Sequence, residues 1–140
     1  MAVDGINHKL LESYRAVSAE IETALADRGA LGISPGQASA LLLIDRSGVR
    51  LSDLALRAGI SKQAMMEMVD ALEQGGSVRR KSDPADARAK VVRLTARGSR
   101  QRAEARRAVT TVEGRLRRRL GERRYEQLKQ TLSDMASGEE

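Results

Sequence analysis

Residues 51–68 read LSDLALRAGISKQAMMEM, and the spacing of small, flexible and apolar residues in this stretch decides the fold around it. Ala55 is small enough to let a following helix approach closely, and Gly59, four residues later, can adopt the positive φ of a tight turn. The apolar residues on either side of that turn are expected to pack together, Leu54 and Ala58 before it and Ile60, Met65 and Met68 after it. This spacing is typical of a helix-turn-helix, whose second helix enters the major groove of DNA, although any αα-hairpin shares it.

The residues that follow change to the alternating pattern of β-strands. We expect residues 78–94 to form a hairpin, with strands over 78–80 and 91–94 and a turn around 83–86. Arg88 lies near the tip, where an arginine can enter a narrow minor groove with its negative potential. Asp86 is expected to hold the Arg88 guanidinium through a charge-assisted hydrogen bond; the alternative is a surface ion pair of little energetic effect. Two basic strands directly after a helix-turn-helix predict a wing that contacts DNA.

Amphipathic helices are expected on both sides of this region. Residues 6–28 repeat apolar side chains every three to four positions, which predicts a first long helix. The next helix is expected from Pro35 to about residues 47–48, and residues 49–51 are expected to be extended. Helix N-caps are predicted at Ser34, Ser52 and Ser61, and Thr95 is expected to start a long helix. Gly121 separates the long helix after Thr95 from a last amphipathic helix.

The positive charge of the chain is concentrated in one segment. The 140 residues carry a formal net charge of +6. Residues 79–107 contain 11 Lys and Arg against 3 Asp and Glu, whereas residues 1–78 are net negative. Such a field attracts polyanions, of which nucleic acid is the commonest; the alternative is a solvated, Arg-rich helix face.

Composition excludes several classes of site. Two tyrosines without Phe or Trp cannot form a stacking platform for single-stranded nucleic acid. With no cysteine and His8 as the one histidine, we expect no disulfide, thiol nucleophile or metal site. No Gly-rich loop lies between a strand and a helix, so neither a cofactor nor an enzymatic activity is expected. No apolar run approaches membrane length and no secretory signal is visible, which predicts a cytoplasmic protein.

Residues 83–98 read DPADARAKVVRLTARG, and this segment closely resembles the wing signature of MarR-type winged-helix transcriptional regulators. With the helix-turn-helix before it and helices at both ends, the resemblance covers nearly the whole chain. It implies a mainly α fold with a small β-hairpin wing, that is, a winged helix-turn-helix with N- and C-terminal dimerisation helices. It also implies a homodimeric regulator, a repressor in many relatives, that binds a pseudo-palindromic duplex operator in the cytoplasm of a bacterium or archaeon, on the nucleoid. Many relatives are released by small phenolic or other anionic ligands; the resemblance does not assign the residues of such a site here.

Carried over to this chain, the resemblance divides it into three regions. Residues 1–33 would form an N-terminal dimerisation helix, 34–98 the winged helix-turn-helix (51–74 and 78–94), and 99–140 the C-terminal dimerisation helices. The candidate DNA contacts are Ser61, Lys62, Gln63, Met66 and Glu67 on a recognition helix over 61–74, and Arg80, Lys81, Asp86, Arg88 and Lys90 on the wing. The candidate dimer contacts are Ile6, Leu10, Tyr14, Val17, Leu116, Leu120, Leu128 and Leu132. These apolar stripes have little surface of their own chain to cover, which favours a dimer.

Two positions depart from the pattern of the relatives. Where those usually carry Thr or Ser followed by Arg, this chain has Met66 and Glu67. Met can touch a thymine methyl and Glu can accept from cytosine N4, but neither suits a phosphate, so Lys62 and Gln63 remain the polar candidates for base edges. Ser77 stands where an apolar residue is more usual, which predicts a looser start of the hairpin. An alternative function follows from the first departure: a winged-helix protein that has lost specific DNA binding and acts through protein contacts.

Overall fold

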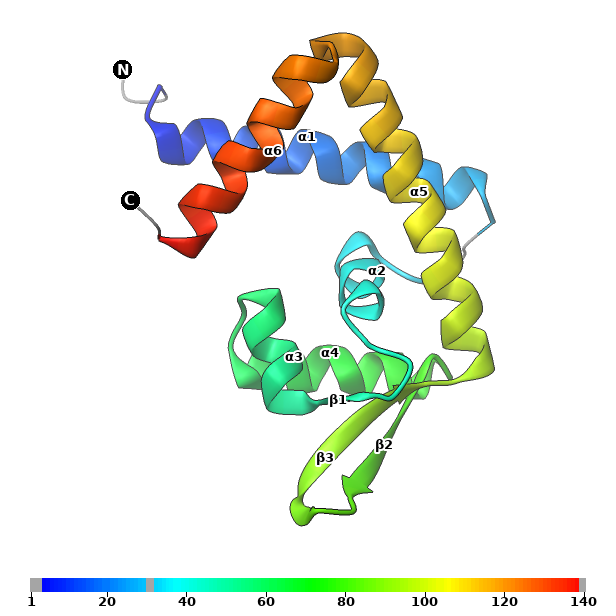
Figure 1. Cartoon of the computed structure of the whole chain (residues 1–140). Coiled ribbons are helices and arrows are strands. Elements are labelled where there is room, and N and C mark those ends of the chain that lie inside the picture. Colours follow the sequence, from blue (N-terminus) through cyan, green and yellow to red (C-terminus); the bar gives the residue numbers. More distant parts are fainter. Residues whose placement is uncertain (1–3, 30–31, 139–140) are drawn as a thin grey trace.

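The computed structural model describes residues 4–29 and 32–138 and arranges them in two lobes joined by one long helix (Figure 1). The elements in chain order are α1 (Ile6–Asp27), α2 (Pro35–Leu42), β1 (Val49–Arg50), α3 (Leu51–Ala58), α4 (Lys62–Gln74), β2 (Val78–Asp83), β3 (Asp86–Leu94), α5 (Ala96–Leu120) and α6 (Glu122–Ser137). This is the predicted order, and it confirms the mainly α fold with a small antiparallel wing. No helix in the described part of the chain is long and apolar enough to cross a bilayer.

One lobe is the winged helix. Its sheet has the order β1-β3-β2, with Val78 opposite Leu94 and Val49 opposite Val92 in antiparallel register. Its core is aliphatic and includes the fully buried side chains Leu41, Ile44, Leu54, Met65, Val69, Leu72, Val78 and Val92. Met65, Met68 and Ala58 pack there as predicted, but Ile60 remains 39% exposed. The prediction that Ile60 packs into this core was therefore wrong.

The second lobe is built on small side chains. Ala24, Leu25, Ala38, Ala105, Ala108 and Val112 form a buried cluster that joins α1, α2 and α5. Side chains of this size let helices approach closely. Figure 1 shows α1 crossing α5, while α5 continues to the base of the wing, so one continuous helix links the two lobes.

The end of α2 differs from the prediction because arginines from other elements satisfy the backbone there. α2 ends at Leu42, about five residues earlier than expected. Arg102 of α5 donates to the carbonyls of Leu41 and Leu42 at 3.2 and 3.4 Å, and Arg57 donates to that of Leu43 at 3.1 Å. These bonds supply partners that a longer helix would otherwise provide.

The third helix also starts earlier than predicted. α3 begins at Leu51, with Arg50 as its N-cap residue, so Ser52 is not the cap. Leu51 is buried in the core of the winged lobe, and we attribute the earlier start of the helix to this packing. In contrast, Ser34 and Ser61 cap α2 and α4 as predicted, and Thr95, which was predicted to start a long helix, caps α5. Each accepts a hydrogen bond from the backbone amide three residues on.

The start of α5 is tightly joined to the start of the hairpin. The Thr95 hydroxyl donates to the Gly76 carbonyl at 2.6 Å and accepts from the Gly98 amide at 3.0 Å. Ser77 is 2% exposed and its hydroxyl donates to Gln101 Oε1 at 2.5 Å. Gly98 lies against this joint so closely that a Cβ there would be 1.8 Å from the Ser77 carbonyl oxygen. The expected looseness at Ser77 is therefore wrong, because a buried hydrogen bond replaces the usual apolar contact.

Tyr125 holds the corner between α5 and α6. The ring is 3% exposed, its hydroxyl donates to Glu113 Oε2 at 2.7 Å, and Arg117 Cζ lies 4.7 Å from the ring centre. Burial, and then the hydrogen bond to Glu113, raise the pKa of Tyr125 to about 12. The corner thus favours the neutral phenol.

A spectrophotometric titration tests this arrangement. In a Tyr14→Phe variant, Tyr125 is the one remaining tyrosine, and its phenolate absorbance should reach half its final value at a pH of about 12. Because the folded pKa is raised, the Tyr125 contribution to stability is complete below pH 10 and is lost as the pH rises toward about 12. The added change Glu113→Gln should lower the midpoint; an unchanged midpoint would show that Glu113 has no part in the shift.

Candidate nucleic-acid interface

The turn between α3 and α4 fixes where the predicted recognition helix starts. Gly59 has a φ of +67°, the left-handed conformation that the sequence predicted for it. The Ser61 hydroxyl accepts from the Ala64 amide at 3.0 Å, which satisfies one of the free N–H groups of the first turn. The hydroxyl of Ser61 is therefore engaged in capping. The cap fixes the direction in which the exposed first turn of α4 begins.

The two faces of α4 have different roles. Met65, Val69 and Leu72 are buried in the core of the winged lobe. The opposite side at the start of the helix exposes Lys62, Gln63, Met66 and Glu67. None of these four side chains forms a hydrogen bond or ion pair with the described residues, 4–29 and 32–138. They are free to contact another molecule.

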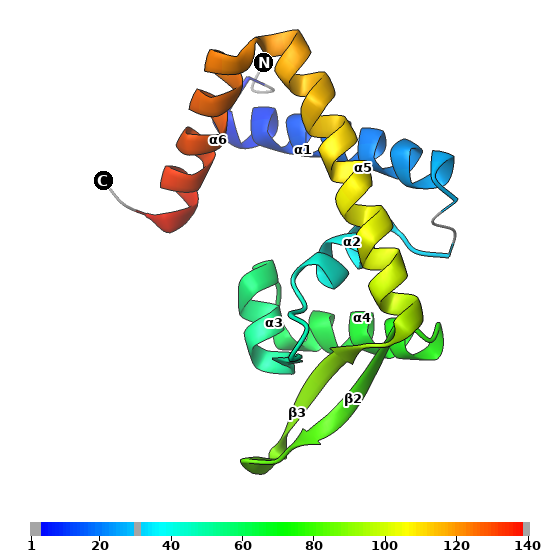
Figure 2. The same cartoon turned by 45° about the vertical axis from the view of Figure 1, so that its right-hand side comes forward.

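The wing projects away from the helices as a two-stranded arm (Figure 2). Arg88 is exposed near its tip. Asp86 Oδ1 accepts from the backbone amide of Arg88 at 3.0 Å, not from its guanidinium, so the predicted charge-assisted bond is wrong. An aspartate forms this local turn readily with an amide two residues on, so Asp86 shapes the tip of the wing. The guanidinium of Arg88 forms no ion pair with the described part of the chain.

A second carboxylate of the wing fastens the arm to the start of α3. Asp83 Oδ2 accepts from Arg50, with Nη2 at 2.6 Å, and Asp83 Oδ1 accepts from the Ala85 amide at 2.9 Å. The Ala85 amide and then the Arg50 guanidinium hold the pKa of Asp83 below its usual value. Arg50 was not among the predicted site residues, because its partner Asp83 lies 33 residues away in the sequence and no local pattern links the two.

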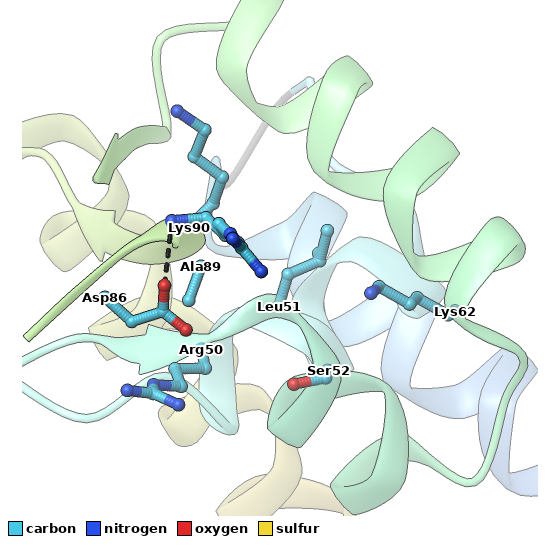
Figure 3. Close-up of a pocket in the computed structure, with 8 residues that line it drawn as sticks. Arg50, Leu51, Ser52, Lys62, Asp86, Ala89 and Lys90 are labelled. Atoms are coloured by element: carbon cyan, nitrogen blue, oxygen red, sulfur yellow. Dashed lines mark hydrogen bonds between the residues drawn. The ribbon is translucent and has the colours of Figure 1, made fainter. Parts of the chain in front are cut away.

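These elements enclose a hollow of about 270 Å³ on one surface (Figure 3). It is lined by Arg50, Leu51 and Ser52 from the start of α3, by Lys62 from α4, and by Asp86, Arg88, Ala89 and Lys90 from the wing. The Lys62 side chain points from α4 toward the side of the hollow formed by the wing. Arg50 is paired with Asp83, but Lys62, Arg88 and Lys90 form no ion pair with the described residues, and Asp86 is the one carboxylate in the lining. The concave surface is therefore positive, and such a surface attracts phosphate groups. The structure thus brings four predicted site residues together, Lys62, Asp86, Arg88 and Lys90.

Arg80 is placed differently from the other wing candidates. Its Nη2 lies 2.6 Å from Asp70 Oδ1 and 3.0 Å from Glu73 Oε1, both on α4. Its backbone amide also donates to Glu73 Oε2 at 2.8 Å. That amide and then the guanidinium hold the pKa of Glu73 below its usual value, so the carboxylate stays ionised. In contrast, the neighbouring Lys81 is exposed and has no such partners among the described residues.

The apolar candidates for dimer contact lie on α1, on the last turns of α5 and on α6, elements that lie at the other end of the molecule from the wing (Figure 1). Ile6, Leu10, Tyr14, Leu128 and Leu132 are exposed to between 38 and 70%. Val17 and Leu116 are partly buried against the small-residue cluster, and Leu120 is also partly buried. Neither lobe shows, over residues 4–29 and 32–138, a group of three His, Cys, Asp or Glu side chains able to hold a metal ion.

Comparisons with known proteins agree with this geometry. Residues 31–89 match the model of the MarR family. The repressor CouR bound to a 23-mer DNA duplex is similar with a TM-score of 0.83 and 29% identity, over 95% of this chain and 93% of that one. A MarR-family regulator from Rhodococcus sp. RHA1 has a TM-score of 0.82 and 27% identity, over 97% and 95% of the two chains. CouR from Rhodococcus jostii RHA1 bound to p-coumaroyl-CoA has a TM-score of 0.79 and 28% identity, over 95% and 92%. A comparison with curated protein sequences finds no match.

Proposed function

The chain belongs to the MarR family of winged-helix transcription regulators, and we propose that it is a homodimeric repressor of a pseudo-palindromic duplex operator. The observation that carries the proposal is the positive hollow, which joins the free start of α4 to the tip of the wing. A helix that enters a major groove and an arm that reaches the next minor groove need this proximity. In a symmetric dimer the two recognition helices would lie about 34 Å apart, one turn of DNA.

The contacts divide by chemistry. We assign base reading to Lys62, Gln63, Met66 and Glu67, and minor-groove contact to Arg88. Backbone contacts are assigned to Lys81 and Lys90, which suit phosphate oxygens. Ser61 and Asp86 would act mainly by shaping the elements that carry these residues. The region 34–98 is then the DNA-binding unit, and 1–33 and 99–140 form the dimerisation unit.

A small-molecule effector is part of the proposal. One CouR structure holds p-coumaroyl-CoA and another holds DNA, so that relative binds both classes of molecule. We extend this to a small anionic effector that releases the present chain from its operator. A change of DNA affinity on adding candidate thioesters or phenolic acids is the direct measurement of this part.

Selection of bound duplexes from a random pool tests the function. We expect enrichment of a site with two inverted half-sites, and an affinity that falls steeply with salt, by about 0.9 in log K per log unit of salt for each phosphate neutralised. Absence of binding even at low salt would reject the proposal in favour of a protein-contact role. The contacts assigned to bases should affect the preferred sequence, whereas those assigned to phosphates should weaken all duplexes alike.

Dimerisation is tested by placing a charge on the exposed face of α6. Leu132→Glu should convert the dimer to a monomer, because a two-fold interface would bury the new carboxylate twice without a partner. Sedimentation equilibrium measures the mass of each form. Leu56→Glu, at a position on α3 that is 78% exposed, is the matched control and should remain dimeric. A Leu132→Glu chain that is still dimeric would contradict the assigned interface.

A further inference from the structure

Arg80 connects the recognition helix and the wing through several bonds to the same two acids. Its guanidinium contacts Asp70 through Nη2 at 2.6 Å and Glu73 through Nη2 at 3.0 Å and Nε at 3.3 Å. The backbone amide of Arg80 donates to the other oxygen of Glu73 at 2.8 Å. We call this set of contacts among Asp70, Glu73 and Arg80 the Arg80 clamp.

The guanidinium in this clamp is directed toward α4. The Arg80 side chain is 26% exposed, and donors on two of its three nitrogens are engaged by carboxylates of α4. A phosphate contact would have to compete with charge-assisted bonds that are already formed, and the phosphate would approach two anions. Arg79, the neighbour on the same strand, is exposed and has no such bonds to the described residues.

The Arg80 clamp lies at the opposite end of α4 from the residues proposed to read bases. Glu73 lies eleven residues after Lys62 in α4, a distance of about 16 Å along the helix axis. A tilt of about 10° at the clamped end would move the start of the helix by about 3 Å, the length of a hydrogen bond. A small change of helix angle at the Arg80 clamp therefore displaces the residues that would read bases by a distance that can break a hydrogen bond.

We propose that Arg80 is a positioning residue, which sets the angle between α4 and the wing so that both reach the grooves of one duplex together. This inference rests on the proposed function. It assigns to Arg80 an effect on specific binding alone, because weak non-specific binding depends on the summed positive charge and not on the angle between two elements. It also assigns a positive role in DNA binding to Asp70 and Glu73, two acids that would otherwise only repel DNA.

The sign of the effect at the two acids provides the test. We compare the wild-type dimer with Arg80→Met and with the double variant Asp70→Asn/Glu73→Gln, using a duplex selected by the wild type and a random-sequence duplex. Electrostatics alone predicts that removing two negative charges tightens both complexes. The clamp predicts that specific affinity falls by about tenfold, from the loss of charged hydrogen bonds, while affinity for the random duplex does not fall.

Combining the variants separates positioning from a phosphate contact. If Arg80 acts through the acids, the triple variant should bind the selected duplex no more weakly than Arg80→Met, with an unchanged salt slope. If Arg80→Met instead lowers the slope by about one phosphate per subunit, equally in both backgrounds, Arg80 touches DNA and the inference is wrong. Arg79→Met is the matched control on the same strand, and thermal unfolding shows that each variant is folded.

The outcomes also distinguish this inference from the function on which it rests. A wild-type chain that selects no duplex rejects the proposed function and the clamp with it. A wild-type chain that selects a duplex, with acid variants that bind it as tightly or more tightly, rejects the clamp and leaves the function standing. If Arg80→Met does not fold, the acid variants alone decide the question, because their predicted effect is opposite in sign to that of charge removal.

Discussion

Replacing Gly98 by alanine is expected to lower the free energy of unfolding by about 3 kcal/mol or more, the upper part of the range for overpacked sites. Helix propensity argues the other way, since alanine stabilises a helix interior by about 1 kcal/mol relative to glycine. Sterics decide the sign here. The added Cβ would lie 1.8 Å from the Ser77 carbonyl oxygen, and that atom belongs to backbone held by the hydrogen bonds of the hairpin start. Chemical denaturation in urea measures the change.

Gly114 offers a matched control in the same helix. It also lies within α5, but a Cβ there would meet only the flexible end of Arg118, at 3.7 Å. Gly114→Ala should therefore stabilise the chain, by up to about 1 kcal/mol. Opposite signs for the two substitutions would establish that α5 is locked against the wing; a Gly98→Ala chain as stable as the wild type would contradict the joint described at Ser77.

The second large effect is expected at the tip of the wing. Arg88→Ala should weaken binding to the selected duplex by at least about thirtyfold, because each of the two wings of a dimer would lose an arginine contact of about 1–3 kcal/mol. The exposed guanidinium forms no ion pair within the described residues, so its removal should leave folding unchanged. Fluorescence anisotropy with a labelled duplex measures the affinity, and circular dichroism checks the fold.

A matched arginine outside the proposed interface controls for net charge. Arg106 is exposed on α5, ten residues after Ala96 and so about 15 Å along the helix from the end that joins the wing. Arg106→Ala removes the same charge. We expect less than a few-fold change in DNA affinity from it, since salt screens charges beyond about 10 Å. Equal losses for the two variants would show that overall charge, and not the wing tip, determines binding. Unchanged affinity for Arg88→Ala would remove the wing contact from the proposed mechanism.

Local signals in the sequence predicted the elements that depend on local chemistry. Gly59 marked a turn because few other residues adopt its positive φ, and Thr95 marked the start of α5 because a hydroxyl there satisfies a free amide. The wing was visible from its alternating pattern and its turn residues. These features depend on neighbours within a few positions, which a sequence displays directly.

The errors arose where distant residues complete the structure. The end of α2 depends on Arg102, which follows it by some 60 residues, and the start of α3 is held by Arg50 with Asp83. Arg80 was predicted to contact DNA because of its charge and its position on the wing. Its ion pairs with Asp70 and Glu73 depend on the angle between α4 and the wing, which the sequence does not give. Two acids spaced three apart on a helix, followed by a basic strand, are the one signal that would have indicated the clamp.

The construction of α4 also bears on how such a regulator can evolve. Met65, Val69 and Leu72 are committed to the core, and Asp70 and Glu73 to Arg80. The exposed positions proposed to read bases, 62, 63, 66 and 67, all lie in the first half of the helix, and their side chains form no hydrogen bond or ion pair with the described residues. Mutations at these four positions can explore new operators without loss of stability, whereas a change at either acid requires a compensating change on the wing. The fold can therefore be conserved while the DNA target diverges, because the two depend on different positions of α4.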